Sequence, residues 1–190
     1  MTDQEFALDL QRLESMLRTK RIPVVDFLRP GLPTNEVESR LAGAGFQVTD
    51  DLVTWFSWHD GADLDGWRSV PLFYSFPFNS LDAAIAWARG EAADDLLLEE
   101  LEGWAPFSYV PLFAEDKTKT LGLAFNVGDH HVVRLGWYDA PGFVAHGSLQ
   151  HFVRRLTDAY MAGAHYYDPS SQLMESDPEL LAQFFPEGFA

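Results

Sequence analysis

The sequence predicts an α+β fold in a single domain spanning residues 1–190, with N-terminal helices, a small mainly antiparallel sheet and a closing C-terminal helix. Apolar residues recur at helical spacing in the first third of the chain and again near its end. Runs rich in β-branched and aromatic residues, separated by short polar turns, fill much of the part between. A composition of 47% hydrophobic and 22% charged residues fits one globular domain.

Three helices are expected before residue 62. The first covers residues 3–20, with Phe6, Leu10, Leu13 and Leu17 on its apolar face. The second begins at Asn35, an N-cap with Glu38 at capping-box spacing. The third begins at Thr49, also an N-cap, and ends before Gly61, which is suited to a left-handed cap. Its apolar face contains Leu52, Trp55, Phe56 and His59.

The middle of the chain predicts extended structure and two more helices. Residues 68–78 have the composition of an edge strand or extended segment. Ser80 is suited to cap the next helix, and a short, very acidic helix is expected over residues 91–103. Three strand-like runs follow with polar turns between them, which predicts an antiparallel meander: residues 107–114, 121–127 and 131–139.

The C-terminal part predicts a long helix and a structured tail. Ser148 is the expected N-cap of this helix and Gly163 its end. The buried stripe consists of Leu149, Phe152, Val153, Leu156 and Tyr160. The tail, residues 166–190, has a turn at Asp168-Pro169 and a short last helix begun by Asp177-Pro178.

Charge is the strongest global feature. The chain has 13 Lys+Arg against 29 Asp+Glu, a formal net charge of −16. Such a surface repels phosphate backbones and anionic lipid and attracts basic partners, although acidity also serves solubility. Cysteine is absent, which excludes disulfides, thiolate zinc sites and a cysteine nucleophile. We expect a cytoplasmic protein, because the N-terminus lacks signal-peptide features and no apolar run is long enough to span a membrane.

A histidine–aspartate pair and a pair of histidines are candidates for catalysis or metal binding. His59 and Asp60 are adjacent, but neighbours on a helix point in different directions, which favours a packed structural histidine. His146 and His151 flank Ser148, whose position is that of an N-cap and lacks a nucleophile-elbow pattern. We expect no catalytic residue, metal or cofactor. A small hydrolase or metal enzyme that uses these residues remains the alternative hypothesis.

The order of these elements resembles the SUKH superfamily, which includes bacterial immunity proteins and fungal cell-wall assembly regulators. Residues 32–63 resemble its opening, in which a helix ends in an aromatic-x-x-(His or Asn)-(Asn or Asp)-Gly pattern. That pattern is occupied here by Trp55, Phe56, Trp58, His59, Asp60 and Gly61. Residues 104–113 resemble the family's Trp-containing strand. Residues 121–163 resemble its hairpin, strand and closing helix, with Ser148 in the helix-starting position. The similarity covers a core of about residues 30–165, preceded by the helix of residues 1–22 and followed by the tail of residues 166–190.

The resemblance implies binding rather than catalysis. Many bacterial members look like immunity proteins that occlude a toxin, often a nuclease or deaminase domain, and an acidic domain suits a basic toxin. A regulatory scaffold without a toxin partner is a further alternative. Exposed aromatic side chains and carboxylates are the expected contacts, although Trp67 has an alternative place in the core and an acidic helix face is often only solvated. The candidate partner-binding residues are Asp63, Asp65, Trp67, Asp94, Asp95, Glu99, Glu100 and Glu102.

Overall fold

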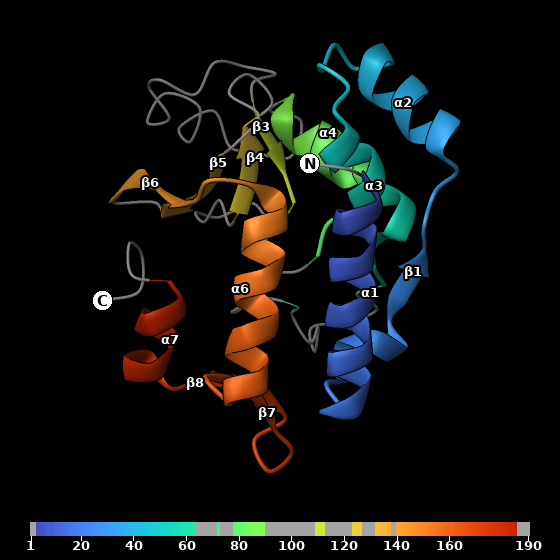
Figure 1. The fold of residues 1–190 in the computed structure, drawn as a ribbon. Coiled ribbons are helices and arrows are strands. Elements are labelled where there is room, and N and C mark those ends of the chain that lie inside the picture. Colours follow the sequence, from blue (N-terminus) through green and yellow to red (C-terminus); the bar gives the residue numbers. More distant parts are fainter. Residues whose placement is uncertain are drawn as a thin grey trace.

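The computed structural model describes residues 3–63, 72, 78–89, 109–112, 123–126, 132–137 and 140–185. Helices and antiparallel strands both occur, so the predicted α+β class is confirmed (Figure 1). The helices are α1 (Asp3–Thr19), the 3-10 helix η1 (Pro23–Asp26), α2 (Thr34–Gly43), α3 (Asp50–Trp58), α4 (Leu81–Ala88), α6 (Leu149–Ala162) and α7 (Pro178–Phe184). The strands are β1 (Leu28–Pro30), β2 (His59–Ala62), β3 (Tyr109–Pro111), β4 (Leu123–Asn126), β5 (Val132–Trp137), β6 (Ala140–His146), β7 (His165–Asp168) and β8 (Leu173–Ser176).

The first and the long C-terminal helix, α1 and α6, pack side by side and run in the same direction (Figure 1). In the N-terminal halves of the two helices, Asp9 Oδ2 of α1 accepts hydrogen bonds of 2.7 Å from Gln150 Nε2 and Arg154 Nε of α6. At their C-terminal ends, Lys20 Nζ donates to the carbonyl of Met161 at 3.4 Å. Polar contacts at both ends therefore set how the two helices are aligned along their axes.

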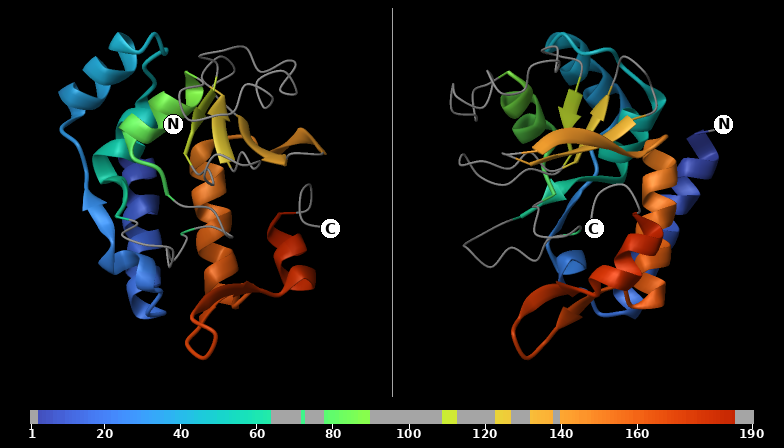
Figure 2. Two further views of the ribbon diagram at one scale, coloured as in Figure 1. Left: turned by 180° about the vertical axis from the view of Figure 1, so that it is seen from behind. Right: turned by 90° about the vertical axis from the view of Figure 1, so that its left-hand side faces the viewer.

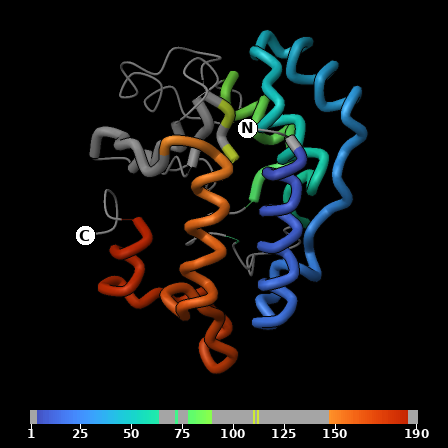
Figure 3. The backbone as a smooth tube through the Cα atoms, viewed as in Figure 1, coloured from blue at the N-terminus to red at the C-terminus, as the bar shows by residue number. Residues whose placement is uncertain are grey.

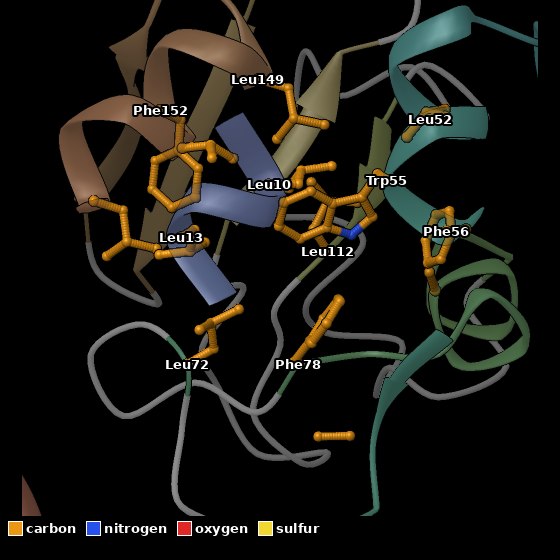
Figure 4. Packing of buried hydrophobic residues seen from close by; sticks show 14 of the residues in the cluster. Leu10, Leu13, Leu52, Trp55, Phe56, Leu72, Phe78, Leu112, Leu149 and Phe152 are labelled. Atoms are coloured by element: carbon orange, nitrogen blue, oxygen red, sulfur yellow. The ribbon is translucent and has the colours of Figure 1, made fainter. Parts of the chain in front are cut away.

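The core joins side chains from both ends of the chain. Leu10 and Leu13 of α1, Trp55 of α3 and Phe152 of α6 are completely buried and lie close together in Figure 4. The predicted stripe of α6 is buried in full, because every one of its five side chains is 1% exposed or less. Burial of each large side chain contributes about 1.5–3 kcal/mol. The helical periodicity of the sequence thus located the core faces of α1, α3 and α6.

Four of the strands form the sheet β3-β4-β5-β6, in which each pair is antiparallel. The register places Val110 opposite Phe125 and Phe125 opposite Val133, so the predicted meander of three strands is confirmed. The fourth strand, β6, was not identified from the residues, because Pro141 and Gly142 near its start are typical of a turn. In the described sheet β6 lies at the end of the strand order, where proline is tolerated.

Two further antiparallel pairs, β1–β2 and β7–β8, form separate two-stranded sheets, and both views in Figure 2 show the β7–β8 hairpin well away from the four-stranded sheet. The chain turns between β7 and β8 at residues 169–172, where Asp168-Pro169 predicted a turn, but the strands on either side were not expected. After β8, helix α7 runs back beside α6 (Figure 3). The rings of Phe152, early in α6, and Phe185, just after α7, lie 6.2 Å apart.

Most predicted helix starts are confirmed by side-chain caps. The oxygens of Thr49, Ser80, Ser148 and Asp177 each accept a hydrogen bond from the backbone N–H three residues later. The prediction for α2 is wrong: the helix begins at Thr34, Pro33 is its N-cap residue, and no side chain caps it. The carbonyl of Pro33 already accepts bonds from the N–H groups of Glu36 and Val37, so the restricted proline backbone replaces the Asn35–Glu38 capping box.

None of the helices in the described part of the chain is long and apolar enough to cross a membrane.

Candidate functional site

The His59-Asp60 pair lies at the start of strand β2, directly after α3, and not on the helix as predicted. The helix ends at Trp58 because His59 already has an extended backbone, with φ −148° and ψ 138°. Successive side chains of a strand point to opposite faces. The structure therefore separates the two side chains, and they contact different parts of the molecule.

The His59 ring is held between two hydrogen-bond acceptors. Its Nδ1 lies 2.7 Å from the backbone oxygen of Arg29 in β1, and its Nε2 lies 3.3 Å from Glu14 Oε2 in α1. A backbone carbonyl only accepts, so Nδ1 is the donor in the 2.7 Å contact and is not available as a base. Nε2 faces the carboxylate of Glu14 rather than open solvent. The geometry indicates a histidine that connects α1, β1 and β2.

Glu14 is the centre of a small polar cluster on α1. Its Oε1 accepts hydrogen bonds from Arg18 at 2.7 Å (Nη2) and 3.1 Å (Nε), and its Oε2 accepts one from Trp58 Nε1 at 3.2 Å. Partial burial alone would raise the pKa of the Glu14 carboxyl, but hydrogen bonds from Arg18, His59 and Trp58 together lower it below its ordinary value. Glu14 is thus kept as an ionised structural partner and is poorly suited to donate a proton.

Asp60 faces the N-terminus of helix α4. Its side chain is buried, and Oδ1 accepts a hydrogen bond of 2.7 Å from the backbone N–H of Leu81, the first residue of the helix. Arg29 Nη2 lies 3.7 Å from Oδ2. A carboxylate at this position satisfies an otherwise unpaired helix N–H and interacts favourably with the helix dipole. Asp60 therefore holds β2 against the start of α4.

Gly61 has the left-handed backbone that was predicted, with φ +75°, but it lies inside β2 and does not end a helix. A β-carbon at this position would lie 2.5 Å from the backbone nitrogen of Ser80 and 2.6 Å from the carbonyl carbon of Asn79. Only glycine allows both this φ and the close approach of the chain before α4. The three residues His59, Asp60 and Gly61 thus form a structural junction, which we call the β2 junction.

The second candidate group surrounds Ser148. Its hydroxyl accepts the backbone N–H of His151 at 3.0 Å and so caps α6. The side chain of His151 is exposed, and Arg155 Nε lies 3.2 Å from its Nε2. The side chain of His146 lies outside the described residues. No group of three or more His, Asp and Glu side chains in the described part of the chain is arranged to hold a metal ion.

Of the candidate partner-binding residues, Asp63 is the one the structure describes. Its side chain is 72% exposed, and its Oδ1 lies 3.6 Å from Arg29 Nε. Its backbone N–H donates to the carbonyl of Phe27. Phe27 is 45% exposed, and the residue before it in the sequence, Asp26, is also exposed. Asp26, Phe27 and Asp63 form a surface that we call the β1–β2 edge. The other candidates lie outside the described residues: Asp65, Trp67, Asp94, Asp95, Glu99, Glu100 and Glu102.

Sequence reasoning missed several exposed apolar side chains. Phe27 is one, and the β7–β8 hairpin contributes Tyr166 and Leu173, which are 45% and 60% exposed. In β7 the exposed Tyr166 follows the buried His165, but β8 shows no alternation of exposure, so the sequence offered no clear strand signal here. These side chains are candidate contacts with a partner because their exposed apolar area can be buried on binding.

Comparison with known proteins identifies no family: the chain matches no protein-family model and no curated protein.

Proposed function

We propose that this chain is a non-catalytic protein-binding module of the SUKH type that neutralises a basic, nucleic-acid-processing toxin by occluding it in the cytoplasm. The observation that carries this proposal is the formal net charge of −16. Complementary charge speeds the encounter of two proteins and disfavours partners of like charge. Nucleic acid and anionic membranes are therefore poor direct partners, and a basic protein is a good one.

The β2 junction supports a binding role over the enzymatic alternative. His59, Asp60 and Gly61 are the most suggestive chemical motif of the sequence, yet each has a structural task in joining α1, β1, β2 and α4. The Nδ1 of His59 is occupied by a backbone oxygen, and one oxygen of Asp60 by a helix N–H. A general base needs a free lone pair directed at its substrate. These contacts leave the pair better suited to holding the fold than to moving protons.

The β1–β2 edge supports the same proposal from the surface. The exposed Phe27 follows the exposed Asp26 in the chain, and its carbonyl accepts the backbone N–H of the exposed Asp63. Aromatic side chains supply area that binding can bury, and neighbouring carboxylates orient a basic partner. Arg29 is close to Asp63, at 3.6 Å, so one of these charges is partly compensated within the chain. We propose this edge as a second contact surface, in addition to the acidic run predicted over residues 91–103.

The decisive experiment begins with the reading frames beside the gene. The C-terminal domain of a neighbouring secreted toxin would be expressed with and without this chain. We expect the toxin domain alone to stop growth, co-expression to restore it, and the purified proteins to form a stoichiometric complex that blocks the toxin's activity in vitro. A toxin domain that stays active at excess chain, or a chain that itself turns over a substrate with stoichiometric metal bound, would overturn the proposal in favour of an enzyme.

A further inference from the structure

The β7–β8 hairpin presents one face to the core and the other to solvent. Its register places Tyr166 opposite Glu175 and Asp168 opposite Leu173. Directly opposed residues, and residues two apart on one strand, project from the same face. These four side chains therefore share one face, which we call the hairpin face. The opposite face carries the buried His165 together with Tyr167 and Met174, which pack against the core.

The hairpin face exposes two large apolar side chains to solvent. Tyr166 is 45% exposed and Leu173 is 60% exposed. The strands are stabilised from the other side, where the ring of Tyr160 lies 5.0 Å from that of His165 and His165 Nδ1 lies 2.7 Å from Ser176 Oγ. A tyrosine and a leucine together on a solvent-exposed face are more typical of an interaction site than of a surface kept for solubility.

The charged residues in this stretch of the sequence have one sign. From Asp158 to Phe185 the sequence contains no lysine or arginine, and its carboxylates are Asp158, Asp168, Glu175, Asp177 and Glu179. In the described part of the chain, none of the ion pairs involves Asp168 or Glu175. The carboxylate of Asp168 accepts hydrogen bonds from the side chain and the backbone N–H of Ser170, which lower its pKa and keep it ionised. Tyr166 and Leu173 thus share the hairpin face with two carboxylates, Asp168 and Glu175, that form no ion pair within the described part of the chain.

We infer that the hairpin face is a docking surface for a basic protein partner, which covers Tyr166 and Leu173 and places lysine or arginine against Asp168 and Glu175. This inference rests on the proposed function, which requires such a partner. It adds a contact surface outside the core of residues 30–165 that resembles a known family. A second copy of the chain is a poor occupant, because it carries the same charge of −16.

The test uses the full chain and a defined probe. The probe is a twelve-residue peptide that alternates lysine with leucine, and its control is the lysine–serine peptide of equal charge. Binding would be measured by calorimetry and mapped by amide chemical-shift changes. We expect the lysine–leucine peptide to bind more tightly than its control and to shift the amides of residues 165–176 most strongly. Shifts that concentrate elsewhere, or equal affinity for both peptides, would overturn the inference.

A matched pair of variants separates this face from exposed leucine in general. Tyr166→Ser with Leu173→Ser should weaken binding of the lysine–leucine peptide by about tenfold, the usual scale for truncated anchors. Leu8→Ser is the control, because Leu8 on α1 is 62% exposed, close to the 60% of Leu173, and Arg12 lies one helical turn away. It should change affinity by less than about twofold. If the Tyr166→Ser, Leu173→Ser double variant and Leu8→Ser weaken binding equally, a specific site is contradicted. Thermal unfolding of each variant checks that the fold is intact.

The toxin experiment distinguishes failure of this inference from failure of the proposed function. If the wild-type chain and the hairpin variant neutralise the toxin equally well, the hairpin inference is wrong and the proposed function stands. If the wild-type chain does not neutralise it, the proposed function is wrong, and the peptide experiment alone decides whether the hairpin face binds basic chains. Loss of protection in the hairpin variant but not in Leu8→Ser supports both.

Discussion

The carboxylate of Asp60 accepts a hydrogen bond of 2.7 Å from the backbone N–H of Leu81, 21 residues later in the chain. This contact joins strand β2 to the start of helix α4, whose N-cap, Ser80, accepts the N–H of Ala83 through its hydroxyl. Two side chains from separate parts of the sequence thus share the capping of one helix. A motif that looks catalytic in the sequence acts here as a helix cap.

Removal of the Asp60 carboxylate should therefore destabilise the fold. Asp60→Ala leaves the Leu81 N–H buried without this acceptor, and we expect a loss of about 1–2 kcal/mol in the free energy of unfolding, as for other helix caps. Asp60→Asn keeps an oxygen acceptor and should lose less. Urea denaturation measures both. Asp63→Ala, at an exposed carboxylate one residue beyond the strand, is the control and should change stability little; equal losses at positions 60 and 63 would refute the capping role.

Three glycine substitutions separate backbone strain from steric conflict. Gly163→Ala should cost about 1 kcal/mol, because φ is +79° there but no atom crowds the new β-carbon. Gly61→Ala should cost clearly more, since the same strain is joined by a β-carbon 2.5 Å from Ser80 N. Gly43→Ala, within α2 and with open space around it, should be neutral or slightly stabilising. Midpoints of chemical denaturation rank the three variants by stability. If Gly61→Ala is as stable as Gly163→Ala, the backbone of the β2 junction shifts to accommodate the added β-carbon.

His59→Gln tests the structural interpretation of the β2 junction. Glutamine can keep one of the two hydrogen bonds of His59, so we expect a loss on the order of 1 kcal/mol in stability and nearly unchanged neutralisation of the toxin. Denaturation and the growth-rescue assay measure the two quantities on the same protein. A His59→Gln chain that folds normally but loses all function would instead identify His59 as part of an active site.

The pH dependence of stability should contain a contribution from His165. Burial lowers the pKa of this imidazole from 6.5 to about 4, although a hydrogen bond with the backbone of Glu175 opposes the shift. Above pH 6.5 the ring is neutral in both the folded and unfolded states. As pH falls from about 6.5 to about 4, the unfolded chain takes up the proton first, and about 3 kcal/mol of stability is lost.

The variant His165→Gln isolates this effect. Its stability at pH 7.5 gives the cost of the substitution itself, and its stability at pH 4.5 shows how much of the acid sensitivity has gone. We expect wild type to lose more stability than the variant between these two values. Parallel pH profiles of the two proteins would mean that His165 titrates alike in both states.

The acidic run gives a prediction about rate. If it steers the toxin, replacement of Asp94, Asp95, Glu99 and Glu100 by lysine should slow association far more than it changes folding stability. The wild-type rate should also fall with salt, because the Debye length shrinks from about 10 Å at 0.1 M to about 3 Å at 1 M. Stopped-flow kinetics measures both. An association rate insensitive to salt and to these reversals would assign the acidity to solubility alone.

Local features of this protein could be predicted well from its sequence. The caps at Thr49, Ser148 and Asp177 each bond an N–H three residues away, so the residues that make the contact are neighbours in the sequence. The apolar stripe of α6 follows from helical spacing in the same way. The meander β3–β4–β5 was predictable too, since its strands follow one another in the sequence and pair with their neighbours.

The sequence by itself thus determined helices α1, α3, α4, α6 and α7, most of their starts and the sign of the net charge. Only the tertiary structure decided what His59 and Asp60 do, because their partners, Arg29 and Leu81, lie 30 and 21 residues away. It also decided which face of the β7–β8 hairpin meets the core, and so left Tyr166 and Leu173 exposed. The physical reason is range: caps and periodicity act between neighbours, whereas the fate of a polar pair or an apolar side chain depends on what the rest of the chain brings beside it.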